Sequence, residues 1–205
     1  MEPLDYHADL TTDRLVAVAL LLQRARRNAA DRFEPEIGDT YLNLGLDAYL
    51  YGKHEIQVAA ESGDYPWLSI VNSSLRFQFR IGEVLMRFWR GDIHEPRENI
   101  VEPTSEELLV QEQQGTLDLG DEDFAAGLVF RINVVSDRSG NLLEAHFVAY
   151  RGEIAECVWP IPFQSSMPLA SAVRPDLPIG PDLPPAEVGP PKSGDAASND
   201  NVEEK

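Results

Sequence analysis

The segment from Leu75 to Arg90 constrains the fold more than any other part of the sequence, because its two halves match when folded about Gly82-Glu83. Glycine in the first position of a two-residue loop suits the primed turns of β-hairpins, whose twist matches that of the flanking strands. A slip of one residue would move every side chain to the opposite face. We therefore predict an antiparallel hairpin with one apolar face, formed by the pairs Ile81 with Val84, Phe79 with Met86 and Phe77 with Phe88.

The polar face of this hairpin is the candidate interaction site, and it collects Arg76, Arg80, Arg87 and Trp89. Arg76 lies opposite Trp89 in the predicted register, so a cation–π contact of about 0.5–1 kcal/mol would fix both side chains. Arginine and tryptophan on a rigid ribbon are typical of interface hot spots. The alternative is that acidic groups of the same chain neutralise these arginines inside the fold.

Two helical regions are expected before the hairpin. The first is signalled by Thr11 to Asp13 and runs to residues 28–32. Its buried stripe comprises Leu15, Val18, Ala19, Leu22 and Ala25, and its solvent side comprises Arg14, Gln23, Arg26 and Arg27. Residues 39–61 fit both strand alternation and helical spacing, and we favour a helix that is broken at Gly52.

The rest of the ordered chain has a short helix and three strands. Thr104 and Glu107 have the spacing of a capping box, which starts the helix. Residues 128–162 alternate as strands do, with turns at 136–141 and at Gly152-Glu153. The second turn is expected to set Tyr150 opposite Ala155, Val148 opposite Cys157 and His146 opposite Trp159.

These elements predict an α+β fold. An antiparallel sheet of about five strands, made from the hairpin and a three-stranded meander, would pack against the N-terminal helices. We expect this single domain to cover residues 1–163. Residues 164–205 are rich in proline and acidic residues and hold too little apolar matter to offset the entropy of ordering, so they are expected to form a disordered tail.

Composition excludes several classes of protein. The formal net charge is −18 over 205 residues, which opposes long-range attraction to nucleic acid and to anionic lipid. No apolar run is long enough to span a bilayer, and the acidic start of the chain is unlike a secretory signal. The single cysteine, Cys157, excludes an intrachain disulfide and favours a reducing compartment. We expect a soluble, cytoplasmic protein that does not engage membranes, and its charge disfavours nucleic acid as a partner.

No group of residues forms a recognisable catalytic, cofactor or metal motif. His54-Glu55 begins like the helix of a zinc protease, but that motif needs a second histidine where Val58 stands. His146 comes near Cys157 in the predicted register, yet zinc requires three or four ligands. Glycine-rich phosphate loops and serine nucleophile motifs are missing from the sequence. We therefore expect no catalytic residue, cofactor or metal site.

These observations favour a small acidic, non-enzymatic protein that binds another protein, as antitoxins, immunity proteins, adaptors and regulatory partners do. Two alternatives stay open. The first is an enzyme whose site is assembled from dispersed residues such as His146, Glu144 and Asp121, since catalytic groups converge in space without a linear motif. The second is a nucleic-acid-related role, either through the arginine and aromatic ribbon or through mimicry of the charge of DNA.

Overall fold

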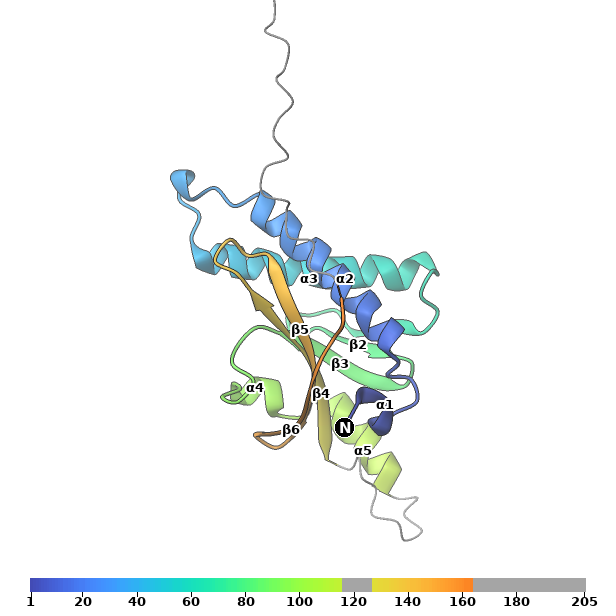
Figure 1. The fold of residues 1–205 in the computed structure, drawn as a ribbon. Coiled ribbons are helices and arrows are strands. Elements are labelled where there is room, and N and C mark those ends of the chain that lie inside the picture. The colour runs from blue at the N-terminus through green and yellow to red at the C-terminus, as the bar shows by residue number, and fades with distance from the viewer. Residues whose placement is uncertain (116–126, 164–205) are drawn as a thin grey trace, which may run out of the picture. The chain divides into compact units, whose positions relative to one another are not determined.

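The computed structural model describes residues 1–115 and 127–163. Its elements are α1 (Pro3–Tyr6), α2 (Thr12–Asp31), η1 (Pro35–Ile37), α3 (Tyr41–Ser62), β1 (Leu68–Asn72), β2 (Gln78–Ile81), β3 (Val84–Trp89), α4 (Glu98–Val101), α5 (Ser105–Gly115), β4 (Leu128–Ser136), β5 (Leu142–Arg151) and β6 (Ile154–Pro160). Figure 1 shows α2 and α3 across the upper part of the strands, α4 to their left and α5 near their lower end. The predicted disordered tail lies outside the described residues.

The sheet has six strands in the order β1-β2-β3-β4-β5-β6. All neighbours are antiparallel except β3 and β4, which run parallel. The α+β class is therefore confirmed, but the prediction of about five purely antiparallel strands is wrong. A parallel pair needs a long crossover connection, and residues 90–127 between β3 and β4 supply it and carry α4 and α5. Strand β1 was missed because it is short and does not alternate cleanly.

The predicted hairpin is confirmed in register next to its turn, whereas the third predicted pair, Phe77 with Phe88, lies beyond the start of β2 and is not part of the ladder. Phe79 pairs with Met86, and Ile81 pairs with Val84. The second predicted turn, at Gly152, is also present, and Tyr150 pairs with Ala155 as expected. Beyond that pair the prediction is wrong by one residue, because a bulge between Ala149 and Tyr150 shifts the register.

Helix α2 begins where the sequence indicates. Thr11 is its N-cap, and the Thr11 hydroxyl accepts a hydrogen bond from the Arg14 N–H at 3.4 Å. All five residues of the predicted stripe are buried. Arg26, which was expected in solvent, is buried as well, with 7 % of its surface exposed. The inner face of α2 is wider than the predicted stripe because the helix packs on both α3 and the sheet.

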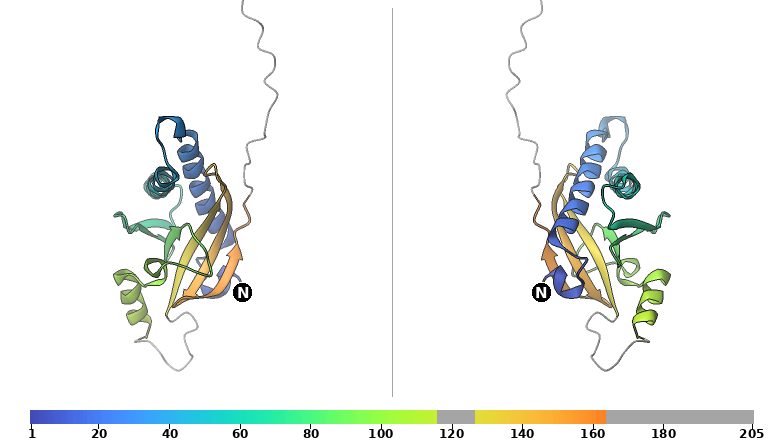
Figure 2. Two further views of the ribbon diagram at one scale, coloured as in Figure 1. Left: turned by 90° about the vertical axis from the view of Figure 1, so that its left-hand side faces the viewer. Right: turned by 90° about the vertical axis from the view of Figure 1, so that its right-hand side faces the viewer.

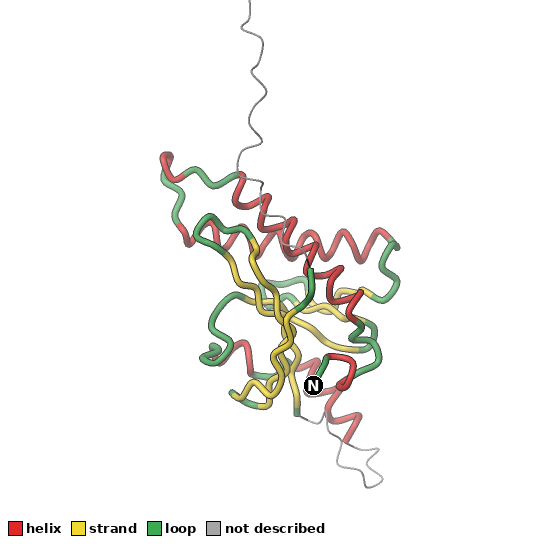
Figure 3. The backbone as a smooth tube through the Cα atoms, viewed as in Figure 1, coloured by secondary structure: helices red, strands yellow, loops and turns green. Residues whose placement is uncertain are grey.

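Helix α3 runs without interruption through Gly52, so the predicted break at this residue is wrong. The glycine serves a close approach instead. Phe88 of β3 reaches the helix backbone at Gly52, and its ring also packs against Tyr49 and Phe77. Figure 3 shows α2 and α3 crossing beside the strands, and this crossing encloses the main apolar core between the helices and the sheet.

The N-terminal residues close one edge of the sheet. Figure 2 shows the N-terminus beside β6 in both views, and the Cys157 thiol lies 3.5 Å from the Met1 carbonyl oxygen. Asp9 then reaches the β2–β3 turn, where its carboxylate accepts a hydrogen bond from the Glu83 N–H at 3.0 Å. Gly82 at this turn has a φ of +59°, and a Cβ there would overlap the Asp9 carboxylate. Glycine is therefore required both for the turn and for the contact.

Alanine substitution of two glycines in α3 tests the helix–sheet contact. Both changes gain helix propensity of up to about 1 kcal/mol. A Cβ at Gly45 meets no atom within 4 Å, whereas a Cβ at Gly52 would lie 2.9 Å from Cζ of Phe88. Overpacking a core costs about 1–3 kcal/mol, so Gly52→Ala should be less stable than Gly45→Ala by about that amount. Urea unfolding measures both variants, and equal stabilities would contradict the close contact.

Asp9 makes folding stability depend on pH. The pKa of Asp9 is lowered from its ordinary value of 3.8, first by the hydrogen bond from the Glu83 backbone and then by Arg14. Such a group stabilises the fold above the pKa of the unfolded chain, and this stability is lost as pH falls through the folded-state pKa. Wild type should therefore be more stable than Asp9→Asn near neutral pH, and the difference should shrink below about pH 4. Urea unfolding across this range checks it, with the exposed Asp64→Asn as control; a difference that does not change with pH would refute the assignment.

Candidate anion-binding cleft

The four residues of the predicted interaction face do not form one exposed surface. Trp89 and Arg87 are buried, with 6 % and 9 % of their surfaces exposed, while Arg76 is exposed and Arg80 is half-buried. Ile100 and Val101 of α4 pack over Trp89 in a second apolar cluster. Among the described side chains, cation–π contacts join Arg14 to Trp67 and Arg32 to Tyr51, and none joins Arg76 to Trp89.

A buried ion pair holds the crossover segment, residues 90–127, against the sheet face that carries Trp89. We call this face the second face of the sheet. Arg131 of β4 is fully buried, and its Nη2 lies 3.1 Å from Oε2 of Glu107 on α5. A second hydrogen bond joins Nη1 to Oε1 of the same carboxylate, and Nε donates to the Ile100 carbonyl oxygen at 2.7 Å. Glu107 also completes the predicted capping box with Thr104, which is confirmed. The acidic group that neutralises Arg131 thus comes from α5.

Arg87 sits beside Arg131 across the parallel β3–β4 pair but does not share its carboxylate. Its guanidinium donates to the Asn99 carbonyl oxygen at 2.9 Å. Burial, and next the charge of Arg131, lower the pKa of Arg87. Arg87 therefore faces α4 and lines a cavity there.

A cavity of about 390 Å³, the inner pocket, lies between the two long helices and the β4–β5 turn. Its lining residues are Arg26, Tyr41, Leu44, Gly45, Arg90, Asp137, Arg138 and Gly140. The β4–β5 turn approaches α3 closely, since a Cβ at Gly140 would lie 3.1 Å from Leu44. Gly140 also has a φ of +93°, which favours glycine. This approach brings Arg138 to the pocket.

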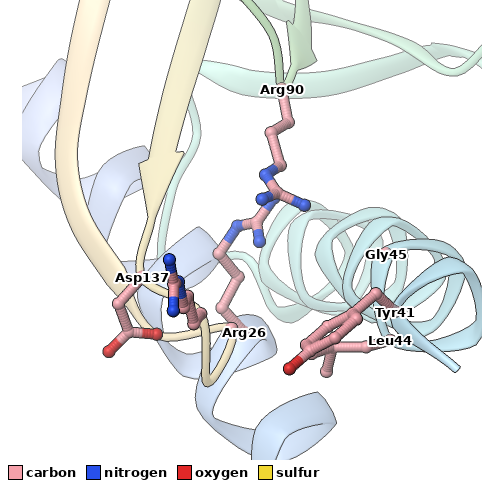
Figure 4. Close-up of a pocket in the computed structure, with 8 residues that line it drawn as sticks. Arg26, Tyr41, Leu44, Gly45, Arg90 and Asp137 are labelled. Atoms are coloured by element: carbon pink, nitrogen blue, oxygen red, sulfur yellow. The ribbon is translucent and has the colours of Figure 1, made fainter. Parts of the chain in front are cut away.

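Arg26 and Arg90 face one another inside the inner pocket. Figure 4 shows their guanidinium groups converging from α2 and from the end of β3. Burial, and next the positive charge of Arg90, lower the pKa of Arg26 to about 10. Within the described parts of the chain, neither side chain has a carboxylate or a hydrogen-bond acceptor as partner. Two adjacent unpaired cations, one of them buried, form a site that is complementary to an anion.

The inner pocket continues into a larger cavity of about 460 Å³, the outer groove, which shares Arg26, Tyr41, Gly45 and Arg90 with it. The groove adds two further arginines, Arg87 and Arg97. It also adds an apolar lining, in which the most prominent members are Leu42, Leu46, Tyr49, Leu75, Phe88 and Ile100. We refer to the inner pocket and the outer groove together as the arginine cleft.

Asp137 is the one acidic residue that lines the arginine cleft in the described part of the chain, against five arginines. Its carboxylate is engaged in its own turn, where it accepts hydrogen bonds from the Asn141 N–H at 2.9 Å and from the Asn141 side-chain amide at 3.4 Å. Figure 4 shows this carboxylate turned away from Arg26 and Arg90. The cleft therefore keeps a local excess of positive charge in an acidic protein.

The other sequence candidates do not come together. His146 pairs with Pro160 and Cys157 pairs with Ala149, so the predicted approach of His146 to Cys157 is not formed. His146 Nε2 lies 3.6 Å from the Glu144 carboxylate, and Asp121 lies outside the described residues. In residues 1–115 and 127–163, no three His, Cys, Asp or Glu side chains gather as metal ligands would.

Arg26 carried a signal in the sequence that was not recognised. It stands four residues after Leu22 and three before Ala29, on the same helical face as both. An arginine inside an apolar stripe indicates either a buried ion pair or a site for an external anion. Its convergence with Arg90 and Arg138 depends on contacts between distant segments, which spacing does not reveal.

Comparison with family models, curated proteins and solved structures gives no match to this chain. None of the helices in the described ranges combines the length and apolar character of a membrane span. The functional argument therefore depends on the chemistry of the arginine cleft itself.

Removal of the Glu107 carboxylate tests whether its pairing with Arg131 holds α5 against the sheet. Leaving Arg131 buried and unpaired costs about 3–5 kcal/mol, so we expect Glu107→Ala to lose that much stability in urea unfolding. The exposed Glu112→Ala on the same helix is the matched control, with an expected change within about 0.5 kcal/mol. Replacing both charges, as Glu107→Leu with Arg131→Met, should recover stability relative to Glu107→Ala. A double variant no more stable than the single one would contradict this account.

Proposed function

We propose that this protein works by binding, without catalysis, and that it takes up an acidic and apolar segment of a partner protein in the arginine cleft. The observation that carries the proposal is the local reversal of charge. Five arginines and one aspartate line this cleft, although the whole chain has a net charge of −18. A concave surface with one sign of charge attracts and orients a ligand of the opposite sign.

The apolar part of the outer groove supports a protein segment as the occupant. Leu42 and Leu46 lie one helical turn apart on α3, and 80 % and 52 % of their surfaces are exposed. Leu75 is 73 % exposed on the facing loop, whose backbone is fixed by a hydrogen bond from the Tyr49 hydroxyl to the Leu75 carbonyl oxygen at 2.6 Å. Apolar side chains on a rigid frame beside arginines have the composition of interface hot spots.

The balance of charge favours a short acidic segment over a nucleic acid. An extended polyanion would meet the field of the whole acidic chain, whereas a short segment needs to enter only the cationic cleft. Trp89 and Arg87, which a ribbon-type nucleic-acid surface would require, are buried under α4. We propose the cytoplasm as the place of this interaction, since the only cysteine is a buried free thiol.

Binding of labelled synthetic peptides tests the proposal. The probes share one leucine-containing frame and carry glutamate, glutamine or lysine at the same positions. Fluorescence anisotropy should give the tightest binding for the glutamate peptide and the weakest for the lysine peptide. Leu46→Ser should weaken binding of the glutamate peptide by about 1–2 kcal/mol, because it removes an apolar anchor from the groove. Arg97→Gln should weaken it as well, and should narrow the preference for glutamate over lysine.

Two variants outside the cleft serve as matched controls. Val58→Ser removes an exposed apolar side chain from the same helix, and Arg24→Gln removes an arginine that pairs with Glu55. Both should bind the glutamate peptide as the wild type does. Equal affinity for the three peptides, or unchanged binding by Leu46→Ser, would overturn the proposal.

A further inference from the structure

The inner pocket has a more specific chemistry than the outer groove. We infer that it binds a phosphoryl group, the dianionic end of a phosphate monoester, between Arg26, Arg90 and Arg138. The inference rests on the proposed function in that both use the arginine cleft, but it needs no partner protein to be tested. The group could belong to a phosphorylated side chain of the partner segment or to a small phosphorylated molecule.

The charge of the lining matches a dianion. Three guanidinium groups and one carboxylate line the inner pocket, so the lining has a formal charge of +2. A phosphate monoester carries about −1.5 to −2 at neutral pH, so it would neutralise this lining. A single carboxylate carries one charge and would leave an excess of positive charge between Arg26 and Arg90.

The burial of Arg26, together with the opening of its guanidinium onto the pocket, favours an external partner of this kind. A buried charge without a hydrogen-bonded partner is costly, and Arg26 has 7 % of its surface exposed and no acceptor among the described residues. Its guanidinium points into the pocket toward that of Arg90 (Figure 4). The planar fork of arginine suits paired hydrogen bonds to phosphate oxygens, and several oxygens allow one phosphoryl group to bridge both guanidiniums.

The size and rim of the pocket agree with a phosphoryl group and its carrier. The volume of about 390 Å³ exceeds what a single anion would fill, and the pocket opens into the outer groove. Tyr41 stands on the shared wall of both cavities, and 68 % of its surface is exposed. A carrier could therefore extend from the inner pocket along the groove past Tyr41.

Phosphate binding to the full-length chain tests this inference directly. The probes are inorganic phosphate and O-phosphoserine, followed by ³¹P NMR and by isothermal titration calorimetry, with chloride at matched ionic strength as the baseline. We expect saturable binding of both probes by the wild type. Arg26→Met and Arg90→Met should each weaken it by roughly tenfold or more, since each removes one fork of the bridge. Arg24→Met, on α2 but outside the cleft, should bind as the wild type does.

A third set of probes identifies the source of the phosphoryl group. The glutamate peptide frame is synthesised with serine or phosphoserine at one central position. Tighter binding by the phosphopeptide than by both phosphoserine and the serine peptide supports a partner segment as the carrier. Equal affinity for phosphopeptide and phosphoserine supports a small molecule instead, and both results uphold a phosphoryl site.

Several results would overturn the inference. One is a wild type that gives no saturable response to phosphate beyond its response to chloride. Another is equal phosphate binding by the wild type and by the folded variants Arg26→Met and Arg90→Met. Arg90 is exposed, so Arg90→Met keeps the test valid where Arg26→Met fails to fold. Failure of the proposed function looks different. If phosphate binds through Arg26 while the glutamate peptide does not bind, the phosphoryl site is supported and the proposed peptide-binding function is refuted. If the glutamate peptide binds while phosphate does not, the peptide-binding function is supported and the phosphoryl site is refuted.

Discussion

The pairing of Arg131 with Glu107 is the contact on which the rest of this structure depends. The parallel pairing of β3 with β4 places Arg87 next to Arg131 on a sheet face that is buried. Two adjacent buried cations need compensation, and one carboxylate from α5 supplies it to Arg131. This contact fixes the crossover segment on the sheet and brings Ile100 over Trp89. Helix α4 and its N-cap residue Arg97 thereby become a wall of the outer groove.

The pairing of Arg131 with Glu107 also determines the hydrogen-bond partner of Arg87. Because Glu107 binds Arg131, Arg87 is left with the Asn99 carbonyl oxygen as its hydrogen-bond acceptor. A carbonyl oxygen carries only a partial negative charge, so the full positive charge of Arg87 remains on the groove. A structural ion pair on one face of the sheet therefore contributes to the electrostatics of a cavity beside it.

The parts of the fold that depend on neighbouring residues could be predicted from the sequence. The β2–β3 turn, the start of α2 and the capping box of α5 each follow from a few adjacent side chains, and each is present. The parallel β3–β4 pairing could not be predicted in this way, because its residues are about forty positions apart and the helices in the described part of the crossover, α4 and α5, are short. Alternation placed Arg87 and Trp89 together on one face, but it carries no information on what covers that face.

The candidate site likewise combines one local signal, which the sequence shows, with contacts between distant segments, which it does not. Arginine inside the apolar stripe of α2 is a local signal, and it marks Arg26 as unusual. Its meaning depends on Arg90 and Arg138, which arrive from the end of β3 and from the β4–β5 turn. Without those two residues, Arg26 would be expected to have an internal carboxylate as its partner, as Arg131 does. The contrast between Arg131 and Arg26 is therefore the sharpest functional indication in the molecule.

Both arginines are buried, yet only one is neutralised by the described chain. Arg131 donates hydrogen bonds to the Ile100 carbonyl oxygen and to both oxygens of Glu107, and so it holds α5 against the sheet. Arg26 faces a second cation, and burial and that cation both disfavour its charged form unless an anion lies beside it. An apolar residue of similar size at this position would cost less without an anion, because buried ion networks are readily replaced by packed apolar side chains. An anion in the inner pocket reverses this balance, since it turns two repelling guanidiniums into two hydrogen-bond donors for one ligand.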